Sequence, residues 1–324
     1  MLYLYLNLKM KEGNNMITKI NPGTKRKSIT FIDDIVYSKV SCPLKECELE
    51  LKMSIMAQYG NSEMRAATGM PVMGDSESNK VVSKKPAIVW IPGGGWRGSD
   101  KNLMVPEMQF LAEAGYVVAS IYYRSSGEAH FPAQIIDVKS AIRFLRANSD
   151  KYSIDLDRVG VIGRSAGGHL TSLACMNLPD YDMGDNLEFS SDVQCGVDLF
   201  GPADLKILME IDRGNIKPGS RWQSVEESHG GALLGGTEET KPELTREASP
   251  VFHVNEKSAP MLIMHGDSDP LVPHSQSVTM HDNMVKAGKE CDLYILEGAG
   301  HGSDEFWQDS TKGKICNFFN KHLK

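Results

Sequence analysis

From residue 86 onward, short apolar runs alternate with longer amphipathic segments, and this alternation restricts the possible folds more than any other feature. The apolar runs predict strands at 87–91, 116–123, 158–163, 194–200, 261–265 and 292–296. The amphipathic segments predict helices at 102–114, 133–148, 165–176, 275–287 and 310–322. Strands that are apolar throughout are buried on both faces, as in a parallel sheet covered by helices on both sides. The chain is therefore predicted to be an α/β protein with a mostly parallel central sheet.

Other segments depart from this alternation. Residues 34–59, with the stretch "CELELKMSIMAQ", predict an antiparallel hairpin at the N-terminal edge of the sheet. Residues 60–85 are polar and glycine-rich, so we expect a loop. Residues 202–249, called the insertion below, are polar with helical pieces and no predicted strand. We expect the insertion to form a small cap over the carboxyl ends of the strands, where open α/β sheets bind ligands. The alternative is a surface excursion with no part in binding.

The ends of the chain and its composition limit the classes that remain. Residues 1–16 are expected to be a flexible extension, and residues 17–324 a single domain with the insertion. The first residues lack a basic leader and a small-residue cleavage site, so we expect no secretory signal. A formal charge of −7 argues against nucleic acid as a partner, and no apolar run is long enough for a membrane span. The six cysteines are scattered without zinc-site spacing, which is typical of reduced thiols in a cytoplasmic protein.

The stretch "VGVIGRSAGGHL" contains Gly163-Arg164-Ser165-Ala166-Gly167, which matches the pattern G-x-S-x-G. An apolar strand precedes the pattern and a helical segment follows it, as a tight strand-to-helix turn around a serine nucleophile requires. Glycine on both sides leaves room for the neighbouring strand and helix, and the turn lifts the Ser165 hydroxyl above the sheet edge. A serine hydroxyl is a poor nucleophile, so it needs a base, and that base needs an orienting acid.

The base and the acid are expected on loops after later strands. "HGDSDPLVP" carries Asp267 and Asp269 after one strand, and "GAGHG" carries His301 after the next. The order Ser, Asp, His is that of α/β-hydrolases. We choose Asp269 as the acid because Pro270 fixes the turn behind it, whereas Asp267 could stabilise the turn through backbone contacts. His265 is expected to be buried and structural, and His169 to pack or form a capping hydrogen bond.

The stretch "IPGGGWRG" permits two interpretations. Gly93, Gly95 and Gly98 fit the dinucleotide-binding spacing G-x-G-x-x-G. The next helix is expected only near residue 102, too far away to aim its N-terminus at a pyrophosphate, although Arg124 after the next strand could suit a 2′-phosphate. A glycine loop that holds an oxyanion fits better, with the backbone N–H groups of Gly94, Gly95 and Ala166 as donors.

These motifs together resemble a known family. "PGGGW", "GRSAGGHL", "HGDSDPLVP" and "GAGHG" are similar to α/β-hydrolase esterases of the acetyl esterase and hormone-sensitive-lipase-like type. The segment from Tyr122 to Leu170 resembles most the bifunctional feruloyl and acetyl-xylan esterase branch. The resemblance implies Ser165, Asp269 and His301 as a catalytic triad, and Gly94, Gly95 and Ala166 as oxyanion donors. Pro92 stands where lipase-like relatives usually have histidine, which favours the carbohydrate-esterase branch.

The predicted function is that of a serine carboxylesterase for short-chain or aromatic acyl esters, with acetyl or feruloyl groups on plant carbohydrates as the favoured substrates. Trp96 is expected to line the acyl pocket, and Trp222 in the insertion to stack on a sugar or an aromatic acyl group. We expect no cofactor and no metal, and a small ester, such as an acylated oligosaccharide, as the only partner. Two alternatives stay open, an amide hydrolase of the arylformamidase or peptidase type and a non-catalytic binding protein. The oligomeric state is left open.

Overall fold

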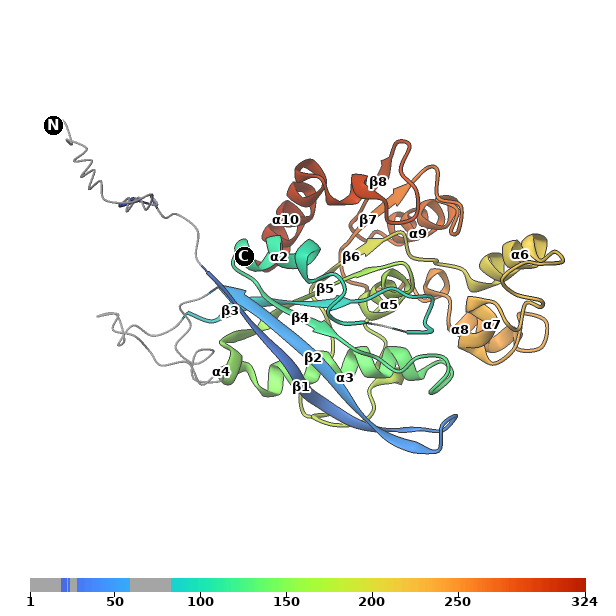
Figure 1. Ribbon diagram of the computed structural model, residues 1–324, viewed down its shortest axis with the longest axis horizontal. Coiled ribbons are helices and arrows are strands. Elements are labelled where there is room, and N and C mark those ends of the chain that lie inside the picture. Colours follow the sequence, from blue (N-terminus) through green and yellow to red (C-terminus); the bar gives the residue numbers. More distant parts are fainter. Residues whose placement is uncertain (1–18, 22, 24–27, 59–82, 99) are drawn as a thin grey trace, which may run out of the picture.

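A computed structural model describes residues 19–21, 23, 28–58, 83–98 and 100–324. The predicted extension at 1–16 and most of the predicted loop at 60–85 lie outside the described residues. Figure 1 shows one central sheet with helices packed against it. Within the described residues, no helix is long and apolar enough to cross a membrane.

The eight strands form one sheet in the order β1-β2-β4-β3-β5-β6-β7-β8. Their bounds are β1 Ile29–Cys42, β2 Cys47–Gln58, β3 Lys85–Ile91, β4 Val117–Ile121, β5 Ile154–Arg164, β6 Cys195–Leu199, β7 Met261–Gly266 and β8 Cys291–Leu296. The hairpin β1–β2 is antiparallel, β2 pairs antiparallel with β4, and all later pairs are parallel. The predicted mostly parallel sheet with an antiparallel N-terminal edge is therefore confirmed.

Two strands begin several residues earlier than predicted. β1 begins at Ile29 instead of residue 34, because Ile29 to Ile32 pair with the end of β2 before a register shift. β5 begins at Ile154 instead of residue 158, because Ile154 pairs with Lys85 across another register shift. Both added segments contain irregular pairing and polar residues, so they lack the continuous apolar run by which the strands were predicted.

Helices cover both faces of the sheet, and the alternation of side chains along each strand separates two cores. The helices are α2 Val105–Glu113, α3 Ala133–Ala147, α4 Ser149–Tyr152, α5 Ala166–Cys175, α9 Ser275–Lys286 and α10 Asp309–Leu323. Ala87, Val89 and Ile91 of β3 belong to the core with α3, α5 and α9. Ile88 and Trp90 point the other way and belong to the core with α2 and α10. Figure 1 shows α2 and α10 on the opposite side of the sheet from α3.

The insertion lies between β6 and β7 and holds three short helices, α6 Leu205–Asn215, α7 His229–Leu234 and α8 Pro242–Glu247. These helices lie together at one end of the molecule in Figure 1. Asp204 caps α6 by accepting hydrogen bonds from the amides of Lys206 and Ile207, and Ser228 caps α7 by accepting one from Gly231. The insertion thus has helices with defined starts and, as expected, no strand.

Candidate active site

Ser165 lies on a sharp turn between β5 and α5 that only this glycine pattern permits. Its φ of 53° and ψ of −122° are strained for a residue with a side chain, and its amide donates to the Leu199 oxygen of β6 at 2.8 Å. A Cβ at Gly163 would lie 2.2 Å from the Gly167 oxygen, and a Cβ at Gly167 would lie 2.0 Å from the Ile91 oxygen of β3. Both contacts are far too short for any side chain, so the two glycines are needed to fit the turn between strand and helix.

The structure brings together the three residues predicted as a triad. The His301 Nε2 atom lies 2.8 Å from Ser165 Oγ, and His301 Nδ1 lies 2.6 Å from Asp269 Oδ2. The Asp269 side chain is completely buried and that of His301 is 14% exposed. The imidazole can therefore accept the serine proton at Nε2 while the carboxylate holds the proton at Nδ1.

Asp269 is held from several sides. Its Oδ1 accepts hydrogen bonds from the amides of Leu271 at 2.8 Å and Val272 at 3.0 Å. Its Oδ2 faces both His301 Nδ1 and, at 3.2 Å, His265 Nε2. Burial alone would raise the pKa of Asp269, but the hydrogen bonds from His265, His301 and Val272 outweigh it and hold the pKa well below its usual value. The carboxyl group is thus ionised near neutral pH and acts only as an acceptor.

The other aspartate has a different environment. Asp267 is exposed, and its Oδ1 accepts hydrogen bonds from the Gly298 amide at 2.8 Å and the Ser268 hydroxyl at 3.0 Å. Asp267 therefore ties the loop after β7 to the loop after β8, whereas Asp269 meets His301.

His265 is buried, as the sequence indicated, but it also contacts the triad acid. Its Nδ1 lies 2.6 Å from the Ser277 hydroxyl, and its Nε2 lies 2.8 Å from the Val272 oxygen. Because Nε2 faces two oxygens, of Val272 and Asp269, it carries the proton. The spacing of four residues between His265 and Asp269 was the available signal for this contact, and sequence reasoning did not use it.

The glycine loop after β3 lies directly beside the serine turn. A Cβ at Gly93 would lie 3.3 Å from the Ser165 Cβ atom. Gly94 and Gly95 have φ values of 127° and 59°, which favour glycine, and Trp96 also has a positive φ of 57°. The amides of Gly94 and Gly95 donate to no acceptor among the described residues. They are thus available as donors, as is the amide of Ala166 at the start of α5.

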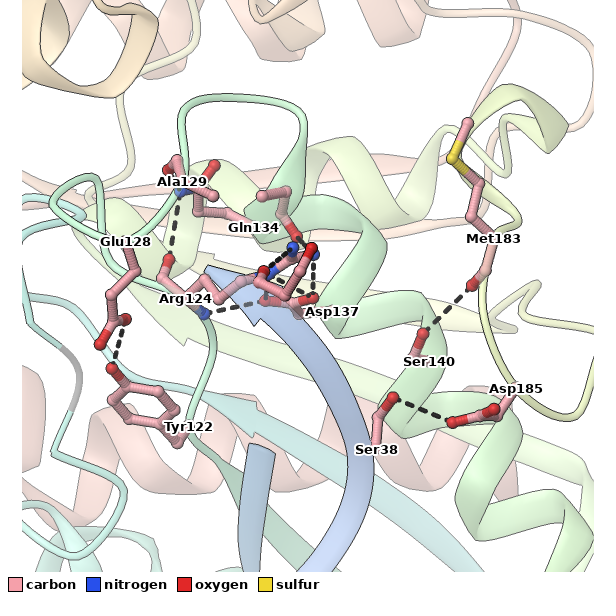
Figure 2. Close-up of polar contacts among 12 residues, drawn as sticks. Ser38, Tyr122, Arg124, Glu128, Ala129, Gln134, Asp137, Ser140, Met183 and Asp185 are labelled. Carbon is pink, nitrogen blue, oxygen red and sulfur yellow. Dashed lines mark hydrogen bonds and ion pairs between the residues drawn. The ribbon is translucent and has the colours of Figure 1, made fainter. Parts of the chain in front are cut away.

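The dinucleotide interpretation of this loop fails on two observations. The next helix, α2, begins only at Val105, so its N-terminus does not follow the glycines. Arg124 is not free for a 2′-phosphate, because it is buried with Asp137 in an ion pair of 2.6 Å and donates further to the Ser41 oxygen. Figure 2 shows Arg124 and Asp137 side by side, with Gln134 bound to the Arg124 backbone.

Among the described residues, no cluster of His, Cys, Asp and Glu could hold a metal ion.

A cavity of about 570 Å³ connects the serine turn, the glycine loop and the insertion. Its lining includes all three predicted oxyanion donors, Ser165, His301 and both predicted substrate-binding tryptophans. Trp96 is only 2% exposed and packs edge-on against buried His169, at 5.1 Å between ring centres, so most of its surface anchors the loop. His169 itself packs there and contacts the Ala248 oxygen at 2.6 Å. Trp222 is half-buried on the wall that the insertion provides.

Sequence reasoning missed most of the lining residues that the insertion provides, and two of them have shifted pKa values. Asp212 of α6 and His229 at the start of α7 both line the cavity. Burial raises the pKa of Asp212, while a hydrogen bond with Ser228 opposes the shift. Burial, and then the nearby guanidinium groups of Arg221 and Arg97, lower the pKa of His229 to about 4. Neither residue belongs to a motif, so only the fold could reveal them.

The comparisons with known proteins agree with this geometry. The BD-FAE family model matches residues 76–284, well over half of the chain. The chain belongs to the BD-FAE family. The matched range ends before His301, so the family match covers the serine and the aspartate of the site but not the histidine.

Among its curated relatives, this BD-FAE protein is 32% identical to Esterase LipC of Mycobacterium tuberculosis over 68% of the chain and 53% of the relative. The chain spans about half the length of the curated relatives it matches. The structure is similar to a truncated carbohydrate esterase from gut microbiota, with a TM-score of 0.71 and 28% identity over 92% of this chain and 97% of that one. It is also similar to an acetyl ester-xyloside bifunctional hydrolase from Caldicellulosiruptor lactoaceticus, with a TM-score of 0.62 and 27% identity over 75% and 85% of the two chains. These similarities show an α/β-hydrolase fold whose named relatives are esterases.

Proposed function

We propose that this protein is a serine carboxylesterase that hydrolyses acetyl or feruloyl esters on carbohydrates derived from plant polysaccharides. The observation that carries the proposal is the continuous contact Ser165–His301–Asp269, with distances of 2.8 and 2.6 Å, on the wall of a cavity. Such an arrangement generates a nucleophile at neutral pH without any other group.

The reaction would proceed by two acyl transfers. Ser165 Oγ attacks the ester carbonyl carbon while His301 Nε2 takes the hydroxyl proton. The ionised Asp269 keeps the other imidazole proton at Nδ1 and stabilises the imidazolium. The carbonyl oxygen becomes negative and receives hydrogen bonds from the amides of Gly94, Gly95 and Ala166, each typically worth about 3 kcal/mol. His301 then protonates the leaving alkoxide, and water, activated by the same imidazole, releases the acid from Ser165.

The carbohydrate part of the proposal rests on the relatives and on the cavity. The names of the structural neighbours include a carbohydrate esterase and an acetyl ester-xyloside hydrolase. The cavity of about 570 Å³ has the size of a site for a small organic molecule. It has room for an ester group together with part of the alcohol that carries it.

The test is a substrate panel with a nucleophile variant. The wild-type protein should hydrolyse 4-nitrophenyl acetate and acetylated xylo-oligosaccharides, and Ser165→Ala should lose essentially all activity while its unfolding temperature stays near the wild-type value. Methyl ferulate tests the aromatic acyl group, and N-formylkynurenine tests amide hydrolysis. Retained activity in Ser165→Ala would remove the nucleophile from the mechanism, and a preference for N-formylkynurenine over every ester would refute the esterase proposal.

A further inference from the structure

The insertion contributes a large part of the wall of the cavity. This part contains aliphatic side chains, such as Leu208 and Ile216, and also groups that can form hydrogen bonds or stack, including Asp212, Trp222 and His229. The polar and aromatic groups among them suit the hydroxyl-bearing part of a substrate.

His229 is fixed in place by contacts with the glycine loop. A Cβ at Gly95 would lie 2.2 Å from His229 Nδ1 and 2.3 Å from Cε1, so this edge of the imidazole packs directly on the Gly95 backbone. The Arg97 guanidinium donates to the Glu227 and Ser228 oxygens just before His229, the latter at 3.1 Å, and holds this part of the insertion against the loop. Nε2 is not among the three imidazole atoms nearest to Gly95.

The chemistry of His229 matches a neutral polar ligand. Its pKa of about 4 makes the imidazole neutral near pH 7, because burial and the Arg221 and Arg97 guanidinium groups oppose a charge there. The buried Nδ1 atom lies against the Gly95 backbone, which opposes the fall in the pKa of His229, and it has no hydrogen-bond partner of good geometry among the described residues. A neutral imidazole nitrogen accepts from or donates to a hydroxyl group, whereas an anion would favour a charged partner.

Trp222 stands next to His229 on the same wall. The two rings meet edge to face, with centres 4.8 Å apart and an angle of 77° between their planes. Trp222 is half-buried and lines the same cavity as Ser165 and His301. The Arg221 guanidinium lies 5.4 Å from the centre of the Trp222 ring, so a sugar would stack on the face that Arg221 leaves open. An aromatic face beside a hydrogen-bonding group offers both of the contacts that a sugar ring makes, apolar C–H contact and hydroxyl pairing.

We propose that His229 and Trp222 form the alcohol-side subsite of the enzyme, in which Trp222 stacks on the sugar ring that carries the ester and His229 Nε2 pairs with one of its hydroxyl groups. This inference rests on the proposed esterase function and adds the residues that select the alcohol. Neither residue takes part in the acyl transfer itself, so their loss should change substrate preference and leave the chemistry intact.

The sharpest variant is His229→Phe, which keeps an aromatic ring packed on Gly95 and beside Trp222 but removes both ring nitrogens. For monoacetylated xylobiose we expect kcat/KM to fall about 3- to 10-fold, the usual effect of one neutral hydrogen bond. For 4-nitrophenyl acetate, which has no sugar, kcat/KM should stay within about twofold. Trp222→Ala should lower kcat/KM for the sugar ester on the order of tenfold with the same selectivity. The control is His281→Ala, because His281 lies on α9 and outside the cavity lining, and this variant should leave kcat/KM unchanged for both substrates.

The failure of this inference can be told apart from the failure of the esterase proposal. Equal effects of His229→Phe on both esters, or no effect on either, would overturn the subsite while the esterase function stands. Binding of xylobiose to the Ser165→Ala variant, measured by calorimetry, tests the subsite without catalysis. Weaker xylobiose binding after the added change His229→Phe supports the subsite even if no ester is hydrolysed, and unchanged binding overturns it.

Discussion

Replacing Asp269 by asparagine tests the proposed catalytic geometry, because the structure determines how the new amide must lie. The position of Oδ1 accepts hydrogen bonds from two amides, those of Leu271 and Val272, so only the oxygen of asparagine can occupy it. The amide nitrogen then takes the position of Oδ2 and presents a proton to His301 Nδ1, 2.6 Å away. His301 must therefore accept at Nδ1 and carry its own proton at Nε2, where it can no longer take the proton of Ser165.

The magnitude follows from this forced tautomer. A carboxylate-to-amide change in a Ser-His-Asp triad lowers kcat by about 10⁴-fold, which corresponds to about 5 kcal/mol in the activation free energy. The assay is the kcat for 4-nitrophenyl acetate near neutral pH, with unfolding curves to show that the variant is folded. Asp267→Asn is the matched control, since Asp267 is exposed and does not contact His301, and its kcat should stay within about twofold. A kcat of Asp269→Asn within tenfold of the wild type, or an equal loss in Asp267→Asn, would refute the assignment of the acid.

Three further changes test the support of the site. His265→Leu should lower kcat about tenfold with little change in KM, because the triad carboxylate loses its 3.2 Å contact with the imidazole. His265→Gln can donate from a similar position and should restore most of the rate. Equal rates in the two variants would exclude a positioning role for His265. Gly167→Ala should lower the free energy of unfolding in urea by more than about 2 kcal/mol, because its Cβ would lie 2.0 Å from a β3 oxygen. The control Gly313→Ala on α10 has open space around its Cβ and should be neutral or stabilising. His169 has a pKa of about 4 in the folded protein and about 6.5 in the unfolded chain, so the unfolded chain binds the proton first as the pH falls. The free energy of unfolding should therefore decrease by roughly 3 kcal/mol between pH 6.5 and pH 4. If the free energy of unfolding depends on pH in the same way in His169→Gln, this prediction is wrong.

The central sheet could be predicted because its inner strands are buried on both faces. β3, β6, β7 and β8 were placed within two residues of their observed bounds, since apolar residues dominate each of them, although β6 contains Asp198 and the partly exposed β8 contains Asp292. The beginnings of β1 and β5 were predicted too late because pairing there continues through polar and irregular residues, such as Asp155 and Asp157. Local hydrophobic pattern indicates burial, but pairing with a distant strand decides where the extended backbone ends.

Within the candidate site, the residues after strands were predictable and those of the insertion were not. Ser165, Asp269 and His301 follow strands whose carboxyl ends meet at one edge of the sheet, so their order in the chain already indicates that they meet. His229 and Asp212 lie on short helices whose placement depends on contacts with the glycine loop and with Ser228. Nothing in their local sequence shows those contacts, because they join segments far apart in the chain.

Trp96 shows how the chemistry and the specificity are divided between sheet and insertion. It was predicted to line the acyl pocket, and it does border the cavity, but at 2% exposure it mainly packs inside the loop against His169. Its neighbour Arg97 donates hydrogen bonds to the backbone of the insertion just before His229. The loop that presents the proposed oxyanion donors therefore also positions the wall that faces the substrate. Among the described residues, the side chains of that wall form no hydrogen bond with the proposed triad acid, so we expect substitutions there to change the accepted alcohol more than the position of Asp269.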